Sequence, residues 1–175
     1  ENMDPDAYLA SLDLLDTEEL AQVLSRLNIS EKARVTAEGL YLSEKLPFAF
    51  NYVDGDYDVT HDRDGQGEHG SHVAGIAAAN AVAGANVVGM APDAQLVIMQ
   101  VFTPGSGAQM THILAALEDA MALECDVANL SLGSPAGFTS TDPESNAIYQ
   151  RIADSDIIVD SAAGNERTCS YRNLW

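Results

Sequence analysis

The chain has 175 residues, and its 27 acidic and 8 basic side chains give a net charge of −19 at pH 7. The length suits a single domain, and 46% hydrophobic with 20% charged residues is ordinary globular usage. A surface this negative repels phosphates and anionic headgroups, which argues against nucleic acids and membrane surfaces as partners. No apolar run reaches the roughly 20 residues of a transmembrane helix, and no basic start of a signal peptide is present, so we expect no membrane insertion within this segment.

The first third of the sequence carries short helix signals followed by an aromatic stretch. Asp4 and Pro5 form one helix start, and Asp16 with Glu19 has the spacing of a capping box. An apolar stripe at helical period follows the capping box, made of Leu20, Val23, Leu24 and Leu27. Residues 40–53 are aromatic-rich and interrupted by Pro47, which predicts an irregular or edge strand.

From residue 69 onward, helical and strand patterns alternate. Residues 69–82 are small and apolar, which predicts a buried helix packed tightly against a flat surface. The later elements that we expect are strands at 96–102, 127–132 and 157–162 and helices at 110–123 and 144–153. Strands that alternate with helices predict an α/β fold with a doubly wound parallel sheet.

Four short motifs then occur in a fixed order. They are HGSHVAG at 69–75, GMAPDA at 89–94, DVANLSLG at 126–133 and AAGNE at 162–166. The ordered set resembles the subtilisin-like serine proteases (subtilases, peptidase S8), and the aromatic stretch before it is similar to the cell-envelope proteinases of that family. The resemblance implies a subtilisin-like sheet with helices on both faces, incomplete at both ends. Residues 1–175 would then be a partial catalytic domain, with a helical and irregular segment plus acidic loop at 1–68 and an α/β core at 69–175.

The resemblance also implies roles for individual residues. His69 corresponds to the general base of the family, and Asn165 to the side-chain donor of its oxyanion hole. Ser131, Leu132 and Gly133 correspond to the strand edge that pairs with the substrate backbone, and Gly105 to the facing edge. The implied activity is serine-type hydrolysis of peptide bonds in a protein or peptide substrate, without a cofactor, outside the cell or in its envelope.

The residues alone leave plainer interpretations open. His69 could be a buried, hydrogen-bonded imidazole, Asn165 a turn residue after Gly164, and Gly105 an ordinary exit from a strand. His72 is interpreted as a structural, hydrogen-bonding histidine. Asp160 lies inside an apolar strand pattern, where an unpaired buried carboxylate is costly, so we expect it near a strand end or paired.

Two elements of the family pattern are absent from the sequence. No GTSMA segment is present to hold the nucleophile, and Ser131, Ser134, Ser140, Ser161 and Ser170 all lack that context. The Asp-Thr-Gly or Asp-Ser-Gly turn of the acid is also absent, and Asp54-Gly55 imitates it only superficially. We therefore expect the serine and the acid outside these residues and no activity of the chain alone. The alternative function is a non-catalytic, subtilase-like module that binds peptide or acts as a scaffold; the oligomeric state is not predicted.

The acidic loop and the two cysteines give weaker signals. Residues 54–68 are rich in carboxylates, but an EF-hand counted from Asp54 would place Val59 and Gly65 where glycine and glutamate are required. A solvated acidic loop is the main interpretation, and a calcium-binding module stays open as a third function. Cys125 and Cys169 flank two expected parallel strands at opposite ends, about 20 Å apart, so we expect free thiols.

Overall fold

The structure, a computed structural model, describes residues 4, 7–8, 10–29, 34–60, 67–84, 87–103, 105, 107–133, 143–162 and 164. Its helices are α2 (Thr17–Val23), the 3-10 helix η1 (Leu24–Arg26), α3 (Ala37–Leu40), α4 (His69–Ala78), α5 (Met110–Ala122) and α6 (Pro143–Ala153). Its strands are β1 (Phe48–Asn51), β2 (Val97–Gln100), β3 (Phe102–Thr103), β4 (Gly107–Ala108), β5 (Val127–Leu130) and β6 (Ile158–Ser161).

The capping box at the start of α2 is confirmed. The Asp16 carboxylate accepts hydrogen bonds from the backbone N–H groups of Glu18 and Glu19, at 2.8 and 2.9 Å. The Glu19 side chain accepts one in return from the N–H of Asp16, at 3.1 Å. Because the first N–H groups of a helix have no partner within it, this reciprocal pair fixes where α2 begins.

The strands form three pairs. β1 pairs with β2 in parallel register, with Phe48 opposite Val97, and β5 pairs with β6 in parallel register, with Val127 opposite Ile158. β3 and β4 form a short antiparallel hairpin. The mixed α/β class is therefore confirmed, with small parallel sheets. Within the described residues the three pairs are not joined into one sheet, so the doubly wound sheet remains a prediction.

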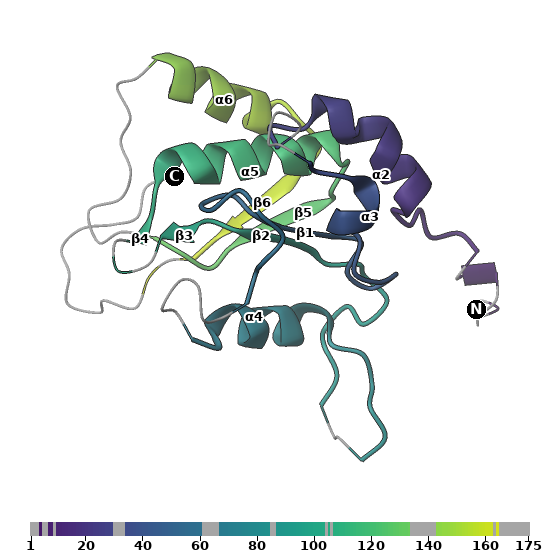
Figure 1. The fold of residues 1–175 in the computed structure, drawn as a ribbon. Helices are drawn as coiled ribbons and strands as arrows, with labels where there is room; N and C mark the ends of the chain where they lie inside the picture. Colours follow the sequence, from purple (N-terminus) through teal and green to yellow (C-terminus); the bar gives the residue numbers. More distant parts are fainter. Residues whose placement is uncertain are drawn as a thin grey trace.

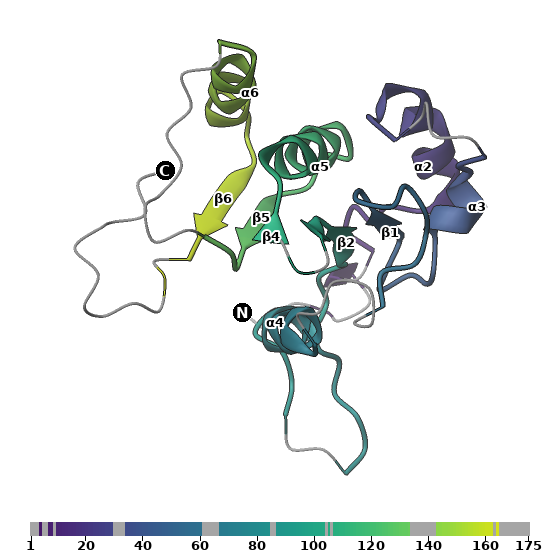
Figure 2. The ribbon, with the colours of Figure 1, turned by 60° about the vertical axis from the view of Figure 1, so that its left-hand side comes forward.

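The strands lie in a layer between helices. Figure 2 shows α2, α3, α5 and α6 on one side of the layer and α4 on the other. Each parallel pair encloses a helix in the sequence, α4 between β1 and β2 and α6 between β5 and β6. Figure 1 shows these two crossover helices on opposite sides of the strands.

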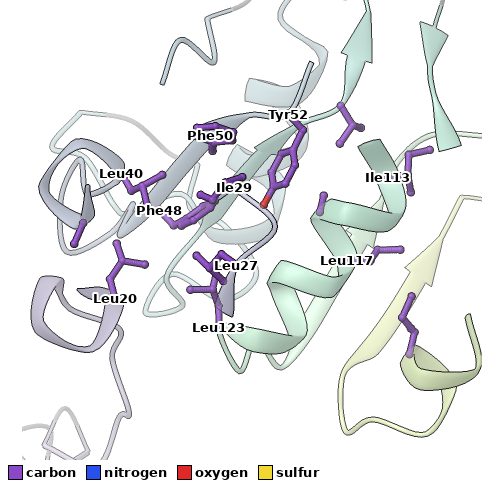
Figure 3. Close-up of a cluster of buried hydrophobic side chains, with 14 residues drawn as sticks. Leu20, Leu27, Ile29, Leu40, Phe48, Phe50, Tyr52, Ile113, Leu117 and Leu123 are labelled. Atoms are coloured by element: carbon purple, nitrogen blue, oxygen red, sulfur yellow. The ribbon is translucent and has the colours of Figure 1, made fainter. Parts of the chain in front are cut away.

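The hydrophobic core fills the side that holds α5. Phe48 and Phe50 of β1 have no exposed surface, and Leu20, Leu27 and Ile29 from the N-terminal segment pack with them (Figure 3). The expected inward face of α5 is confirmed, because Ile113, Leu114, Leu117 and Ala120 are buried and Met121 packs against the core. The N-terminal segment thus belongs to the same core as the strands.

The prediction of a buried helix over residues 69–82 is wrong in two respects. α4 ends at Ala78, which is its one buried residue among those described. Ile76 is 71% exposed and Val82, beyond the helix, is 65% exposed. The apolar pattern is present, but no described segment covers the outer face of this helix.

One face of the β5–β6 pair is also exposed. Along both strands, exposed and half-buried residues alternate, and Ala128 and Val159 face the core. The opposite face presents Val127 and Ile158, which are 56% and 65% exposed. Asp160 lies on this open face, so its charge remains in water and the cost of burying it does not arise.

Candidate active site

His69 is the first residue of α4, and its side chain is exposed. α4 connects two parallel strands, so it runs back along them and begins near the carboxyl end of β1. Carboxyl ends of strands are where open α/β sheets place their binding sites. The alternative of a buried, satisfied imidazole does not agree with this exposed position.

The residues assigned to the substrate edge directly follow β5. Ser131 is half-buried, and its hydroxyl oxygen accepts a hydrogen bond from the Asn129 amide at 2.9 Å. Leu132 packs against the core, while Gly133 is exposed. This segment therefore leaves the core at Gly133, which gives its backbone access to a ligand.

Gly105 lies in the turn of the β3–β4 hairpin and is exposed. Its φ of +74° belongs to the left-handed region that residues with a side chain rarely adopt. Nothing lies within 4 Å of the position that a Cβ would take, so the backbone angle and not space requires glycine here. The turn explains why glycine stands at this position, and the assignment of Gly105 to the substrate edge stays a prediction.

Asn165 lies outside the described residues, and the approach to it is described only as far as Gly164. The N–H of Ala162 donates to the carbonyl of Leu130 at 3.1 Å, which continues the β5–β6 pairing beyond the strand ends. Gly164 is exposed and has a φ of +90°. The AAGNE motif therefore leaves β6 next to the point where the segment containing Ser131 leaves β5.

The structure brings several of these positions to one side of the molecule. In Figure 1 the carboxyl ends of β2, β5 and β6 and the start of α4 all lie toward the left. Among the described residues, no hydrogen bond joins His69 to Gly105 or to the segment 131–133. The start of α4, where His69 lies, is thus on the same side of the molecule as the ends of β5 and β6.

A buried carboxylate on α5 was missed by the sequence analysis. Asp119 is 1% exposed, and its oxygens accept from the backbone N–H and the amide of Asn28, at 2.6 and 3.0 Å, and from the Tyr52 hydroxyl at 2.8 Å. Burial raises the pKa of Asp119, and the hydrogen bonds from Asn28, Tyr52 and Ile29 oppose that rise only in part. The sequence signal for this buried carboxylate is its position in α5, where Asp119 lies on the same inward face as Ala116 and Ala120. Its role is to tie residues 28–29 to α5, on the side opposite His69.

The thiol and acidic-loop predictions are only partly within the described chain. Burial, and then the nearby Asp126, raise the pKa of the Cys125 thiol to about 11, so it stays protonated and unreactive at neutral pH. Cys169 lies outside the described residues, as do residues 61–66 of the acidic loop. In the described part of the chain, no group of three or more His, Cys, Asp or Glu side chains is placed to hold a metal ion. None of the helices built from those residues is long and apolar enough to cross a membrane.

Known proteins resemble this chain over most of its length. The sequence profile of the Subtilase family matches residues 34–173. The PII-type proteinase of Lactococcus lactis subsp. cremoris is 36% identical over 152 residues, which cover 83% of this chain and 8% of that protein. Subtilisin E of Bacillus subtilis (strain 168) is 39% identical over 99 residues, which cover 56% of this chain and 24% of the relative. The Minor extracellular protease Vpr of the same strain is 41% identical over 101 residues, 53% of this chain and 12% of Vpr. The chain thus spans a small part of each of these relatives.

Proposed function

Because this chain belongs to the subtilase family, we propose that it is part of the catalytic domain of a subtilisin-like serine endopeptidase. The proposed domain contains one doubly wound sheet, formed when the β1–β2 and β5–β6 pairs are joined, with helices on both faces. Residues 1–68 contribute the helical segment and acidic loop, and residues 69–175 contribute the α/β core. The proposed location is extracellular or in the cell envelope, which the name of the Vpr relative supports.

In the proposed reaction, His69 is the general base. Its imidazole takes the proton from a serine hydroxyl while the serine oxygen attacks the peptide carbonyl carbon, and then gives that proton to the leaving amine. The Asn165 amide donates a hydrogen bond to the oxyanion that forms on the carbonyl oxygen. The serine and its orienting carboxylate are proposed to come from outside residues 1–175, because none of the serines here stands in a GTSMA segment.

Substrate binding is proposed to occur by strand addition. An extended peptide would pair with the backbone of 131–133 on one side and of the turn at Gly105 on the other. Binding through backbone groups needs no cofactor and accepts many side-chain sequences. The observation that carries the whole proposal is the exposed His69 at the start of α4, on the side of the molecule where Ser131 follows the end of β5.

A second candidate function is a non-catalytic module that binds peptide in the same place. It rests on the strand-pairing positions 131–133 and Gly105, which can bind an extended peptide through backbone groups without a nucleophile. Such a module would keep the strand-pairing residues but would not depend on the imidazole. The two functions therefore differ in what the loss of His69 does.

The test is a comparison of His69→Ala, Asn165→Ala and His72→Ala in the complete protein that contains this chain. His72 is exposed one turn along α4, and within the described residues its side chain makes no hydrogen bond of the kind expected from the sequence, so it serves as the matched control. We expect kcat to fall by about 10³-fold or more for His69→Ala and by about 10²–10³-fold for Asn165→Ala, with little change in KM. The control should stay near the parent value. A near-normal kcat in a folded His69→Ala protein would reject His69 as the base. A complete protein that binds peptide without hydrolysing it, before and after His69→Ala, would reject the protease and leave the peptide-binding module.

A further inference from the structure

The motif GMAPDA, at residues 89–94, has no part in the proposed chemistry, but it makes close contacts with α4. The N–H groups of Gly89, Met90 and Ala91 donate to the carbonyls of Ala79, Ile76 and Ala77, at 2.8, 3.0 and 2.8 Å. The last carbonyls of a helix have no partner within it, so this turn supplies what the C-terminal end of α4 lacks. The turn is a cap for the helix that begins with His69.

The contact is too close for any residue but glycine at position 89. A Cβ on Gly89 would lie 2.3 Å from the backbone nitrogen of Ala79 and 2.6 Å from two backbone atoms of Ala78. Backbone atoms inside a helix cannot move aside as the end of a flexible side chain can. A side chain at position 89 would therefore push the turn and the end of α4 apart.

The same turn is fixed to the strand layer through Lys45. The Lys45 ammonium donates to the carbonyl of Pro92 at 2.6 Å and to that of Ala94 at 2.5 Å. The carbonyl of Lys45 accepts from the N–H of Leu96 at 2.8 Å. Lys45 lies three residues before β1 and Leu96 directly precedes β2, so these bonds connect the cap to the start of both strands.

The C-terminal end of α4 is therefore the end that the described residues fasten. His69 lies nine residues away, or about 14 Å along the helix axis. A rotation of only about 5° about the capped end moves His69 by about 1 Å over that length. An error of about 1 Å in the position of a catalytic group can reduce the rate about 10²-fold.

We infer that Lys45 and the turn at residues 89–94 are positioning residues, which set the tilt of α4 and thereby the place of the His69 imidazole. This inference rests on the proposed function, because it assumes that His69 is the base. Lys45 neither touches the substrate edge nor belongs to α4, so its effect on the reaction would be transmitted through the backbone of the turn.

The test uses Lys45→Met in the active, complete enzyme, since methionine keeps most of the alkyl length and removes the donor. We expect kcat to fall about tenfold or more while KM stays within about twofold, because the base acts on the chemical step and the substrate edge is untouched. Lys45→Arg keeps the donors and should restore most of the rate. Each kcat is measured well below the melting temperature of that variant, where a loss of stability alone leaves the rate unchanged.

Arg151→Met is the matched control, because it removes a cation that pairs with Glu118 on the other side of the strands. His69→Ala is measured in parallel. If His69→Ala abolishes activity but Lys45→Met behaves like Arg151→Met, the positioning role is rejected and the protease assignment stands. If folded His69→Ala keeps its kcat, the proposed function itself fails, and the positioning role fails with it.

Discussion

The two sides of the strand layer differ in how they are covered. On the α5 side, the N-terminal segment, β1 and α5 share one core, and Leu20, Phe48 and Phe50 have no exposed surface. On the α4 side, Ile76, Val127 and Ile158 are more than half exposed. Both sides have apolar sequences, so composition does not separate them. What differs is whether a described segment of this chain lies over the apolar residues.

This difference locates the stability and the proposed chemistry on opposite sides. The α5 side is held together by one core and by the Asp119 hydrogen bonds, which join residues far apart in the sequence. His69 belongs to the α4 side, which we call the open side. There the turn at residues 89–94 holds the C-terminal end of α4. Substitutions on the α5 side, the closed side, should therefore change the free energy of unfolding strongly. Substitutions on the open side should change it little.

The largest expected effect is on the closed side. Phe50→Ala removes a fully buried ring that packs edge-on against Tyr52 and Tyr57, so it should lower the free energy of unfolding by about 3–5 kcal/mol. Urea denaturation of residues 1–175 measures the change. Ile76→Ala on α4 is the counterpart, and we expect less than about 0.5 kcal/mol for it. Equal losses would mean that the two sides do not differ.

Substitutions at two glycines test how closely the turn at residues 89–94 packs against α4. Gly89→Ala should cost about 1–3 kcal/mol, since its Cβ would overlap the helix backbone. Gly75→Ala, in the middle of α4 with nothing within 4 Å of the new Cβ, should instead gain up to about 1 kcal/mol of helix propensity. Thermal or urea unfolding of the two variants measures the signs. If both variants were more stable than the parent, the turn would not pack closely against the helix.

The buried Asp119 makes the closed side sensitive to pH. Its pKa is raised above the usual value of 3.8, so above about pH 4 the unfolded chain releases a proton that the folded chain retains. Stability from this group is therefore full at low pH and is lost as pH rises, by at most about 1.4 kcal/mol per pH unit within the window between the two pKa values. Asp119→Asn mimics the protonated carboxyl group, so it should remove the loss of stability that this group causes as pH rises.

Unfolding free energies measured between pH 4 and 8 for the parent, Asp119→Asn and the exposed control Asp156→Asn test this. The free energy of unfolding of Asp119→Asn minus that of the parent should grow as pH rises, whereas that of the control should follow the parent. If this difference became smaller with rising pH, the hydrogen bonds from Asn28 and Tyr52 would outweigh burial in their effect on the pKa of Asp119.

The smallest effect is expected on the open face of the β5–β6 pair. Ile158→Thr should change the free energy of unfolding by less than about 0.5 kcal/mol, because Ile158 is already 65% exposed and threonine keeps the β-branched shape. Val159→Thr, the next residue and packed on the core, should cost about 1–2 kcal/mol. Binding of an apolar dye to residues 1–175 should fall for Ile158→Thr. A reversed order of the two losses would place the open face on the wrong side of the strands.

Local patterns in the sequence determined much of what the structure contains. The Asp16 and Glu19 spacing fixed the start of α2, and the stripe of Ile113, Leu114, Leu117 and Ala120 identified the inward face of α5. The four motifs predicted the subtilase family, which the family profile over residues 34–173 confirms, because each motif can be recognised from residues adjacent in the sequence. His69 at the start of a helix was also readable, since it opens the small-residue pattern of α4.

Which apolar faces are covered could not be predicted from the sequence and became clear from the packing of the elements. Residues 69–82 have the composition of a buried helix, but burial depends on what other segments lie nearby. The hydrogen bond between Asn28 and Asp119 joins residues that are 91 positions apart in the sequence. The bonds from Lys45 to Pro92 and Ala94 span 47 and 49 positions, and no local pattern specifies such partners. Hydrophobic periodicity reports which residues of one segment share a face, whereas the partner of that face is set by how the chain folds back on itself.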